Sequence, residues 1–221
     1  MSDPTLLRSR FVILISGQGS NMQAIAQACL SGRCPAQVMA VISSRPQSTG
    51  LDWAASHGID THVVSHTEFS SRAAFDATLE GVIERYSPDF VLLAGFMRVL
   101  TSGFVQKYAG RLVNIHPSLL PAFPGLHTHA QALAKGVQVH GCSVHFVTPV
   151  LDHGPLIAQG VVQVEATDTP ESLAERVLAL EHIVYPQVAI WLAQGRVHLM
   201  PDQRVQVDAI SSRLFVSESL S

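Results

Sequence analysis

The sequence has 221 residues, of which 47% are hydrophobic and 14% charged, with a formal net charge of -3 at pH 7. This composition fits one globular domain with a sizeable core and excludes a disordered chain. No basic cluster offers a broad cationic face, so we expect small-molecule substrates and neither a nucleic acid nor a membrane as partner.

The three cysteines, Cys29, Cys34 and Cys142, are odd in number and contain no C-x-x-C pair. This argues against a disulfide framework and against a thiolate zinc site. The opening residues lack a signal-peptide pattern, and no apolar run approaches the ~20 residues of a membrane span. We therefore expect a cytoplasmic protein, with residues 1–10 as an N-terminal extension, 11–195 as the main domain and 196–221 as a tail that can form a short hairpin. Whether it is a monomer or a homodimer stays open.

The first predicted element is a buried strand, 11–15, and a glycine-rich turn, 16–21, follows it at once. Apolar residues at helical spacing come next, and Ser20 or Asn21 is the expected N-cap of that helix. A glycine-rich turn at a helix N-terminus can bind a phosphate, because free N–H groups and the helix dipole favour an anion. The spacing matches neither the P-loop nor the full dinucleotide fingerprint, so a tight turn without a ligand is an equal alternative.

The middle of the chain alternates between strand and helix patterns. Strands are expected at 38–42, 61–64, 90–93 and around Asn114, and helices around Trp53, at 71–86 and at 101–107. Such repetition predicts an α/β fold with a mostly parallel sheet. In the helix at 71–86, the residues expected to face inward are Ala74, Leu79, Val82 and Ile83.

Two features of this half allow more than one interpretation. Arg72 opens a helix, where its cation gains nothing from the positive helix end. It is either a solvated surface charge or a contact for a ligand carboxylate. The apolar loop 94–100 follows a strand, and its side chains either fill the core or line a slot for a flat aromatic ligand.

The second half changes its pattern. A helix at 128–135 precedes a long strand at 137–147, a loop at 148–155 and a second strand at 156–164, which we expect to be antiparallel. A helix starts at 168–171 and carries an apolar stripe to Trp191, with a bend expected at Pro186. The fold class is therefore a single-domain α/β fold with a Rossmann-like open sheet, mostly parallel, with antiparallel strands in the C-terminal half.

The chemistry is expected where a strand ends in Asn114, Ile115, His116 and Pro117. Asn114 and His116 point to the same face, and Pro117 ends the ladder, so the imidazole lies at the carboxyl end of a strand, where open α/β sheets bind ligands. With Asp152 these residues supply an amide donor, a group that titrates near neutral pH and a carboxylate. This set suits acyl transfer to an amine. The alternatives are a structural histidine and an Asp that only forms a turn.

Two other chemistries are less well supported. Ser118 and Cys142 lie near histidines in the sequence, but no nucleophile elbow is present. A metal site has several histidines to draw on in this half, and none of them forms a His-Glu-x-x-His motif. These histidines are His127, His129, His140, His145 and His153. We therefore expect no metal.

Several motifs occur here in one order: Ser-Gly-Gln-Gly-Ser-Asn at 16–21, Leu-Ala-Gly-Phe-Met-Arg at 93–98, Asn-Ile-His-Pro-Ser-Leu-Leu-Pro at 114–121, and Ser-Val-His-Phe at 143–146 with Leu-Asp at 151–152. Together they resemble the phosphoribosylglycinamide formyltransferases, purine-pathway enzymes that use 10-formyltetrahydrofolate. The resemblance covers roughly 11–191. It implies direct attack of the substrate amine on the formyl group, with no covalent enzyme intermediate and no metal.

The resemblance also implies a role for each matching residue. Asn114 would hold the formyl oxygen, His116 would be the charged partner and proton carrier, and Asp152 would orient His116 and a relay water. Residues Gly19, Ser20 and Asn21 would bind the ribonucleotide phosphate, and Glu181 would contact its ribose or glycinamide end, although a solvated helix carboxylate is the alternative for Glu181. The folate would contact Arg72, Met97, Arg98, Val99, Leu100, Thr148, Val150 and Leu151.

The sequence departs from the family pattern at a few loop positions. Gln18 stands where Asn is common, and Ala122 and Pro149 also differ. His153 stands where Gly is usual, and its Cβ would be costly if that residue needed a positive φ. Two competing functions stay open: a hydrolase that releases formate from 10-formyltetrahydrofolate, and a non-catalytic folate or nucleotide sensor on the same scaffold.

Overall fold

The structure is a computed structural model that describes residues 8–217. Residues 1–7 of the predicted N-terminal extension and residues 218–221 of the predicted tail lie outside the described residues. Within that range the elements follow in this order: β1 (Ser9–Ile15), α1 (Ser20–Leu30), β2 (Ala36–Ser43), α2 (Thr49–Ser56), β3 (Asp60–Val63), η1 (His66–Glu68), α3 (Arg72–Glu84), β4 (Phe90–Leu93), α4 (Ser102–Lys107), β5 (Leu112–His116), α5 (Thr128–Lys135), β6 (Val139–Phe146), β7 (Leu156–Gln163), α6 (Pro170–Ala193), β8 (Val197–Leu199), β9 (Val205–Val207) and β10 (Leu214–Val216).

One central sheet organises the chain, with the strand order β10-β7-β6-β5-β4-β1-β2-β3. The strands β1 to β5 pair in parallel, whereas β6 is antiparallel to both β5 and β7. This confirms the predicted α/β class and the change of pattern in the second half. The order reverses between β1 and β4, and open α/β sheets bind ligands at the carboxyl ends of the strands at such a point.

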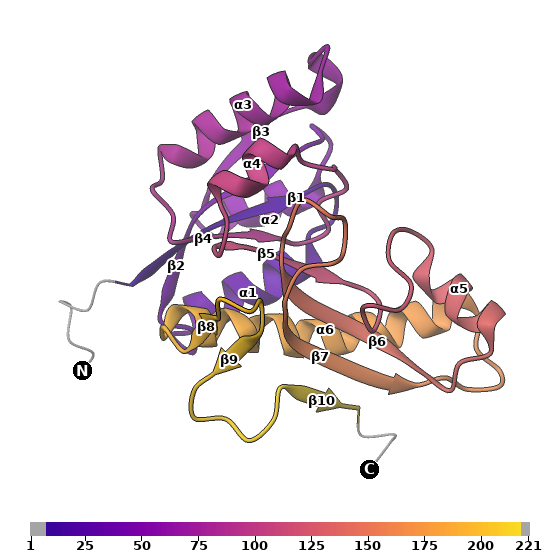
Figure 1. The fold of residues 1–221 in the computed structure, drawn as a ribbon. Helices are drawn as coiled ribbons and strands as arrows, with labels where there is room; N and C mark the ends of the chain where they lie inside the picture. Colours follow the sequence, from indigo (N-terminus) through magenta and orange to yellow (C-terminus); the bar gives the residue numbers. More distant parts are fainter. Residues whose placement is uncertain (1–7, 218–221) are drawn as a thin grey trace.

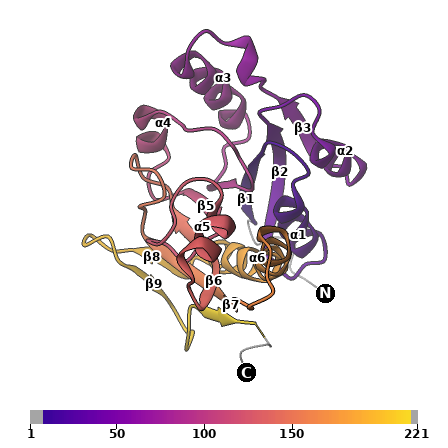
Figure 2. The same ribbon diagram turned by 90° about the vertical axis from the view of Figure 1, so that its right-hand side faces the viewer.

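Helices cover both faces of the sheet (Figures 1 and 2). The alternating side chains of β1 explain why: Phe11, Ile13 and Ile15 belong to the core beneath α1 and α6, while Val12 and Leu14 belong to the core beneath α3. All five are fully buried. A continuous apolar run of this kind is what a parallel strand with two covered faces requires.

Two local expectations were wrong. The N-cap of α1 is Gly19, in a left-handed conformation with φ of 67°, and neither Ser20 nor Asn21 caps the helix with its side chain. In α3 only the assignment of Ala74 was wrong, because it is exposed, whereas Leu79 and Ile83 are buried and Val82 packs against the core as expected. Phe75 is the buried residue in that turn, and its ring packs against aromatic neighbours in the core.

The tail carries more structure than a hairpin. Strands β8 and β9 form an antiparallel pair. Beyond them, β10 pairs in parallel with β7 and so extends the central sheet by one strand. The last described segment therefore lies at the edge of the sheet, below β7 in Figure 1.

Candidate active site

Strand β5 presents two polar side chains on the face of the sheet opposite α6. Asn114 and His116 share this face, while Val113 and Ile115 point into the core beneath α6. The next strand places His145 opposite Asn114 and Ser143 opposite His116. The expected alternation thus brings the amide and the imidazole together at the carboxyl end of β5.

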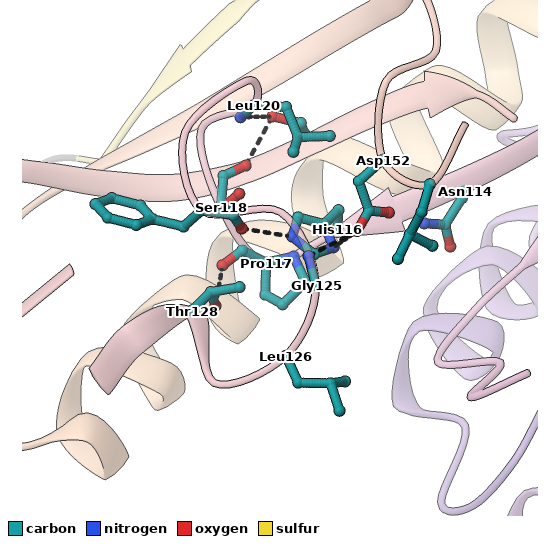
Figure 3. Close-up of polar contacts among 12 residues, drawn as sticks. Asn114, His116, Pro117, Ser118, Leu120, Gly125, Leu126, Thr128 and Asp152 are labelled. Carbon is teal, nitrogen blue, oxygen red and sulfur yellow. Dashed lines mark hydrogen bonds and ion pairs between the residues drawn. The ribbon is translucent and has the colours of Figure 1, made fainter. Parts of the chain in front are cut away.

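His116 lies between two oxygen acceptors (Figure 3). Its Nδ1 is 3.6 Å from Oδ2 of Asp152, and its Nε2 is 3.0 Å from the carbonyl oxygen of Phe123. The side chains of both His116 and Asp152 are 7% exposed. Because each ring nitrogen faces an oxygen, only the doubly protonated imidazolium can donate to both, and the site therefore suits a charged His116.

The loop that supplies the Phe123 carbonyl is fixed by buried hydroxyl groups. Ser143 Oγ donates to the carbonyl of Ser118 at 2.7 Å and accepts from the backbone N–H of Leu120 at 3.0 Å. Thr128 Oγ1 donates to the carbonyl of Pro117 at 2.6 Å. The Leu120–Pro121 peptide bond in this loop is cis, a point that the sequence could not settle.

Asp152 comes from the loop between β6 and β7, which rises beside β5 toward α4 (Figures 1 and 2). Its Oδ2 also accepts from the backbone N–H of Gly125 at 2.9 Å. The positive φ in this turn, 53°, belongs to Asp152, a residue type that tolerates it, and not to His153. The Cβ of His153 therefore introduces no strain of this kind, and its Nδ1 contacts the Leu151 carbonyl.

His145 contacts the Asn114 side chain, and sequence reasoning had assigned it no role in the site. Its Nδ1 is 2.9 Å from the carbonyl oxygen of Phe146, and its Nε2 is 3.3 Å from Nδ2 of Asn114. Burial lowers the pKa of His145, so the ring is neutral, with Nδ1 as donor and Nε2 as acceptor. His145 thereby fixes which end of the Asn114 amide is the donor. The contact depends on the pairing of β5 with β6, which no local sequence pattern specifies.

The glycine-rich turn after β1 has the geometry of an anion site. Because Gly19 caps α1 without a side-chain bond, the first N–H groups of the helix stay open to a ligand. The turn is held from behind, since Ser48 Oγ donates to the Gly17 carbonyl at 2.5 Å and Gly50 N donates to it at 3.3 Å.

Asn21 and Glu181 meet across 160 residues of sequence, from α1 and α6. Asn21 Nδ2 donates to Glu181 Oε2 at 2.6 Å, and both residues are buried. Burial raises the pKa of Glu181 to about 7, although the bond from Asn21 acts in the opposite direction. A buried carboxyl group that titrates near neutral pH is unusual for a solvated helix side chain, the alternative considered for Glu181.

The residues assigned to the folate lie on two loops and one helix end. In the loop after β4, the side chains of Met97 and Val99 are more than half exposed. In the loop after β6, those of Val150 and Leu151 are also more than half exposed. Phe96 and Leu100 pack on the core, so the loop at 94–100 divides between core filling and an exposed apolar surface. Arg72 is exposed at the first turn of α3. The other members of the set are Arg98, whose Nε contacts its neighbour's carbonyl, and Thr148, whose hydroxyl contacts the Val150 carbonyl.

The side chains weighed as nucleophiles or metal ligands are not arranged for those roles. The Ser118 hydroxyl donates to the Ala122 carbonyl, and burial raises the pKa of the Cys142 thiol. His129 and His140 stack edge to face at 5.2 Å, and burial lowers the pKa of His140 to about 4. Over residues 8–217, no group of three or more His, Cys, Asp or Glu side chains could hold a metal ion. No helix in this range is long and apolar enough to cross a membrane.

An amide, an imidazole and a carboxylate lie together at the carboxyl end of a strand in an open α/β sheet, an arrangement that suits group transfer. The chain belongs to the formyl transferase family, whose sequence model matches residues 9–189. It is 51% identical over 188 residues to the phosphoribosylglycinamide formyltransferase of Escherichia coli (strain K12). This alignment covers 85% of this chain and 89% of the E. coli protein.

Solved structures agree with this family. The phosphoribosylglycinamide formyltransferase of Coxiella burnetii superposes with a TM-score of 0.88 at 46% identity, covering 95% of this chain and all of that one. The formyltetrahydrofolate deformylase of Burkholderia mallei superposes with a TM-score of 0.82 at 29% identity, covering 91% of this chain and 70% of that one. The fold is thus shared by transferases and a deformylase, while the transferases are closer in sequence.

Proposed function

We propose that this chain transfers the formyl group of 10-formyltetrahydrofolate to the amine of phosphoribosylglycinamide. The products are formylglycinamide ribonucleotide and tetrahydrofolate, and the reaction belongs to purine biosynthesis. The observation that carries the proposal is the position of His116 between Asp152 and the Phe123 carbonyl, beside an Asn114 amide that His145 orients.

The chemistry follows from these groups. The amine nitrogen attacks the formyl carbon, and the carbonyl oxygen becomes an oxyanion in a tetrahedral intermediate. The free N–H of the Asn114 amide donates to that oxygen, and the His116 imidazolium adds positive charge nearby. Asp152 stabilises the imidazolium. As the carbon–nitrogen bond to the folate breaks, a proton from the attacking amine passes by way of His116 or a water to the folate nitrogen.

The two substrates would approach from different sides. The nucleotide phosphate would bind at Gly19, Ser20 and Asn21, with Glu181 at its ribose or glycinamide end. The folate would lie against Met97, Arg98, Val99 and Leu100, with Thr148, Val150 and Leu151 closing over it and Arg72 near its carboxylates. Charge on the oxyanion is met by an amide and an imidazolium, so the mechanism uses no metal.

We further propose that the protein acts in the cytoplasm, as a monomer or a homodimer, on small molecules and without a nucleic acid or membrane partner. Support comes from the three cysteines, which are all free and buried, and from the acidic net charge. Size-exclusion chromatography with light scattering distinguishes the two oligomeric states.

The first experiment mixes the protein with 10-formyltetrahydrofolate and a chelator, with and without phosphoribosylglycinamide, and follows tetrahydrofolate and formate separately. We expect tetrahydrofolate only when the amine is present, without formate. Formate release without the amine would establish the hydrolase instead. A sensor would show thermal stabilisation by ligand without any product.

Two variants test the assigned roles. His116→Ala and Asp152→Asn should each lower kcat by about 10²-fold or more, because they remove charge stabilisation that develops during the reaction. The matched control is His198→Ala, since His198 forms a remote, exposed ion pair with Asp208 at 2.7 Å and should leave kcat unchanged. Near-normal turnover in a folded His116→Ala protein would contradict the mechanism.

A further inference from the structure

The loop at 94–101, which carries four of the proposed folate contacts, has few backbone attachments. Within the described part of the chain, its N–H groups make one backbone hydrogen bond, from Ala94 to the Leu14 carbonyl at 2.9 Å. Further along, the loop is held by two side-chain oxygens from outside it, at Met97 and at Thr101. Between those two points Val99 is exposed and Arg98 and Leu100 are partly buried, and within the described residues none of their N–H groups donates a hydrogen bond to the protein.

The first anchor is Ser16, which stands between the end of β1 and Gly17 of the phosphate turn. Its Oγ accepts from the backbone N–H of Met97 at 2.9 Å and lies 2.7 Å from Oγ of Ser44. Ser16 and Ser44 are both buried. The hydroxyl is therefore held from one side by Ser44, and its remaining acceptor capacity is directed at the loop.

The second anchor is Asp76, a buried carboxylate on α3. Its Oδ2 accepts from the backbone N–H of Thr101 at 2.6 Å, and Thr101 in turn caps α4. Among residues 8–217, its buried Oδ1 has no hydrogen-bond partner. A carboxylate in such surroundings is costly to bury. Its one direct protein contact within the described residues serves the end of this loop.

We propose that Ser16 and Asp76 are positioning residues that hold the loop at 94–101 in the shape that binds the folate. This rests on the proposed function for the identity of the ligand, but the anchoring itself does not. With both anchors in place, the loop that carries the apolar side chains of Met97 and Val99 is already ordered before the folate binds. Binding therefore does not pay the entropy cost of ordering this loop. Without an anchor, that ordering weakens folate binding and leaves the catalytic groups on β5 untouched.

The test compares Ser16→Ala and Asp76→Ala with the wild-type protein in steady-state kinetics. A hydrogen bond of ordinary strength corresponds to about a 5-fold effect, so each variant should raise the KM for 10-formyltetrahydrofolate by about that factor. We expect the KM for phosphoribosylglycinamide and kcat to stay near wild type. The matched control is Ser43→Ala, since Ser43 is also a buried serine and, over the part of the chain that the structure describes, its Oγ forms hydrogen bonds only with the backbone of Arg45.

Amide hydrogen exchange gives a readout that does not depend on activity. Ser16→Ala should speed exchange at the Met97 amide about 5-fold and spare Thr101, while Asp76→Ala should do the reverse. Asp76→Asn keeps an acceptor oxygen and should restore most of the protection at Thr101. If Asp76→Ala does not fold, Ser16→Ala and its effect at Met97 still test the anchoring.

Three outcomes would overturn the proposal: unchanged folate KM in both variants, an equal rise in both KM values, or exchange at Met97 and Thr101 that ignores the substitutions. If the wild-type protein makes no formylated product, the proposed function fails, and the exchange experiment still decides whether the two side chains anchor the loop.

Discussion

Glu181 shows how burial changes the behaviour of a single carboxyl group. It is 6% exposed, and its pKa rises from 4.5 to about 7. An acid with a raised pKa in the folded state binds more protons than the unfolded chain. Its contribution to stability is therefore greatest at acid pH and is lost as the pH rises from about 4.5 through 7.

Glu181→Gln should remove this pH dependence. Relative to wild type, the free energy of unfolding of the variant should rise by about 2 kcal/mol between pH 5 and pH 8, measured by urea denaturation. Comparing the two proteins at each pH cancels the opposite effect of the buried histidines. Glu175→Gln, which changes an exposed carboxylate of the same helix, is the control. A constant difference between the variant and wild type would show that Glu181 is ionised throughout.

At the scale of elements, α2 packs closely against the glycine-rich turn at 16–21, the proposed phosphate site, at Gly50. A Cβ on Gly50 would lie 2.7 Å from Ile15 Cδ1, 2.9 Å from the Gln18 carbonyl oxygen and 3.1 Å from that of Gly17. Two of these neighbours are backbone atoms, so relief requires the turn itself to shift. The approach of α2 to the turn thus depends on the absence of a side chain at this position.

Gly50→Ala should raise the KM for phosphoribosylglycinamide about 10-fold and lower the free energy of unfolding by about 1–3 kcal/mol, because overpacking displaces the turn. Urea denaturation and steady-state kinetics measure the two effects. Gly81→Ala is the control, since nothing lies within 4 Å of the added Cβ in α3 and alanine favours a helix. Equal stability of the two alanine variants would contradict the argument.

The sequence predicted the elements that depend on residues close together in the chain, and it missed details that depend on contacts between distant residues. Buried strands such as 11–15 and the helix at 128–135 were predicted because periodicity and turn residues are local signals. The N-cap at Gly19 was missed because a left-handed cap needs no side-chain acceptor. The choice of Phe75 over Ala74 as the inward residue of α3 was missed because it depends on the aromatic rings that Phe75 meets in the fold.

The candidate site was predicted as a set of residues and not as a geometry. Motifs identified Asn114, His116 and Asp152, and the family resemblance supplied their roles, which remain predictions. The link from His145 to Asn114 and the contact of Asn21 with Glu181 depend on pairing between strands and helices far apart in the chain. No local pattern encodes such contacts, so only the folded sheet reveals them.

On the scale of the whole molecule, the proposed site takes residues from both the parallel and the antiparallel part of the sheet. The parallel half supplies the phosphate turn after β1 and the loop after β4, while the antiparallel half supplies Asp152 and His145. The two halves meet at β5, which pairs in parallel with β4 and antiparallel with β6. Asn114 and His116 lie on this shared strand, so the proposed catalytic groups lie where residues from both halves of the sheet come together.

The short strand β10 covers one edge of the central sheet. It occupies the outer edge of β7, with Gln159 N bonded to the Arg213 carbonyl and Ser217 N to the Val161 carbonyl. A chain that stops at Asp208 would leave the eight-residue strand β7 with an open edge, a template for pairing with other chains. We expect light scattering to show that this shortened protein self-associates under conditions where the full chain does not. Equal scattering from the shortened and the full chain would mean that β10 does not prevent self-association. The expected difference would show that covering the edge of β7 with β10 prevents aggregation.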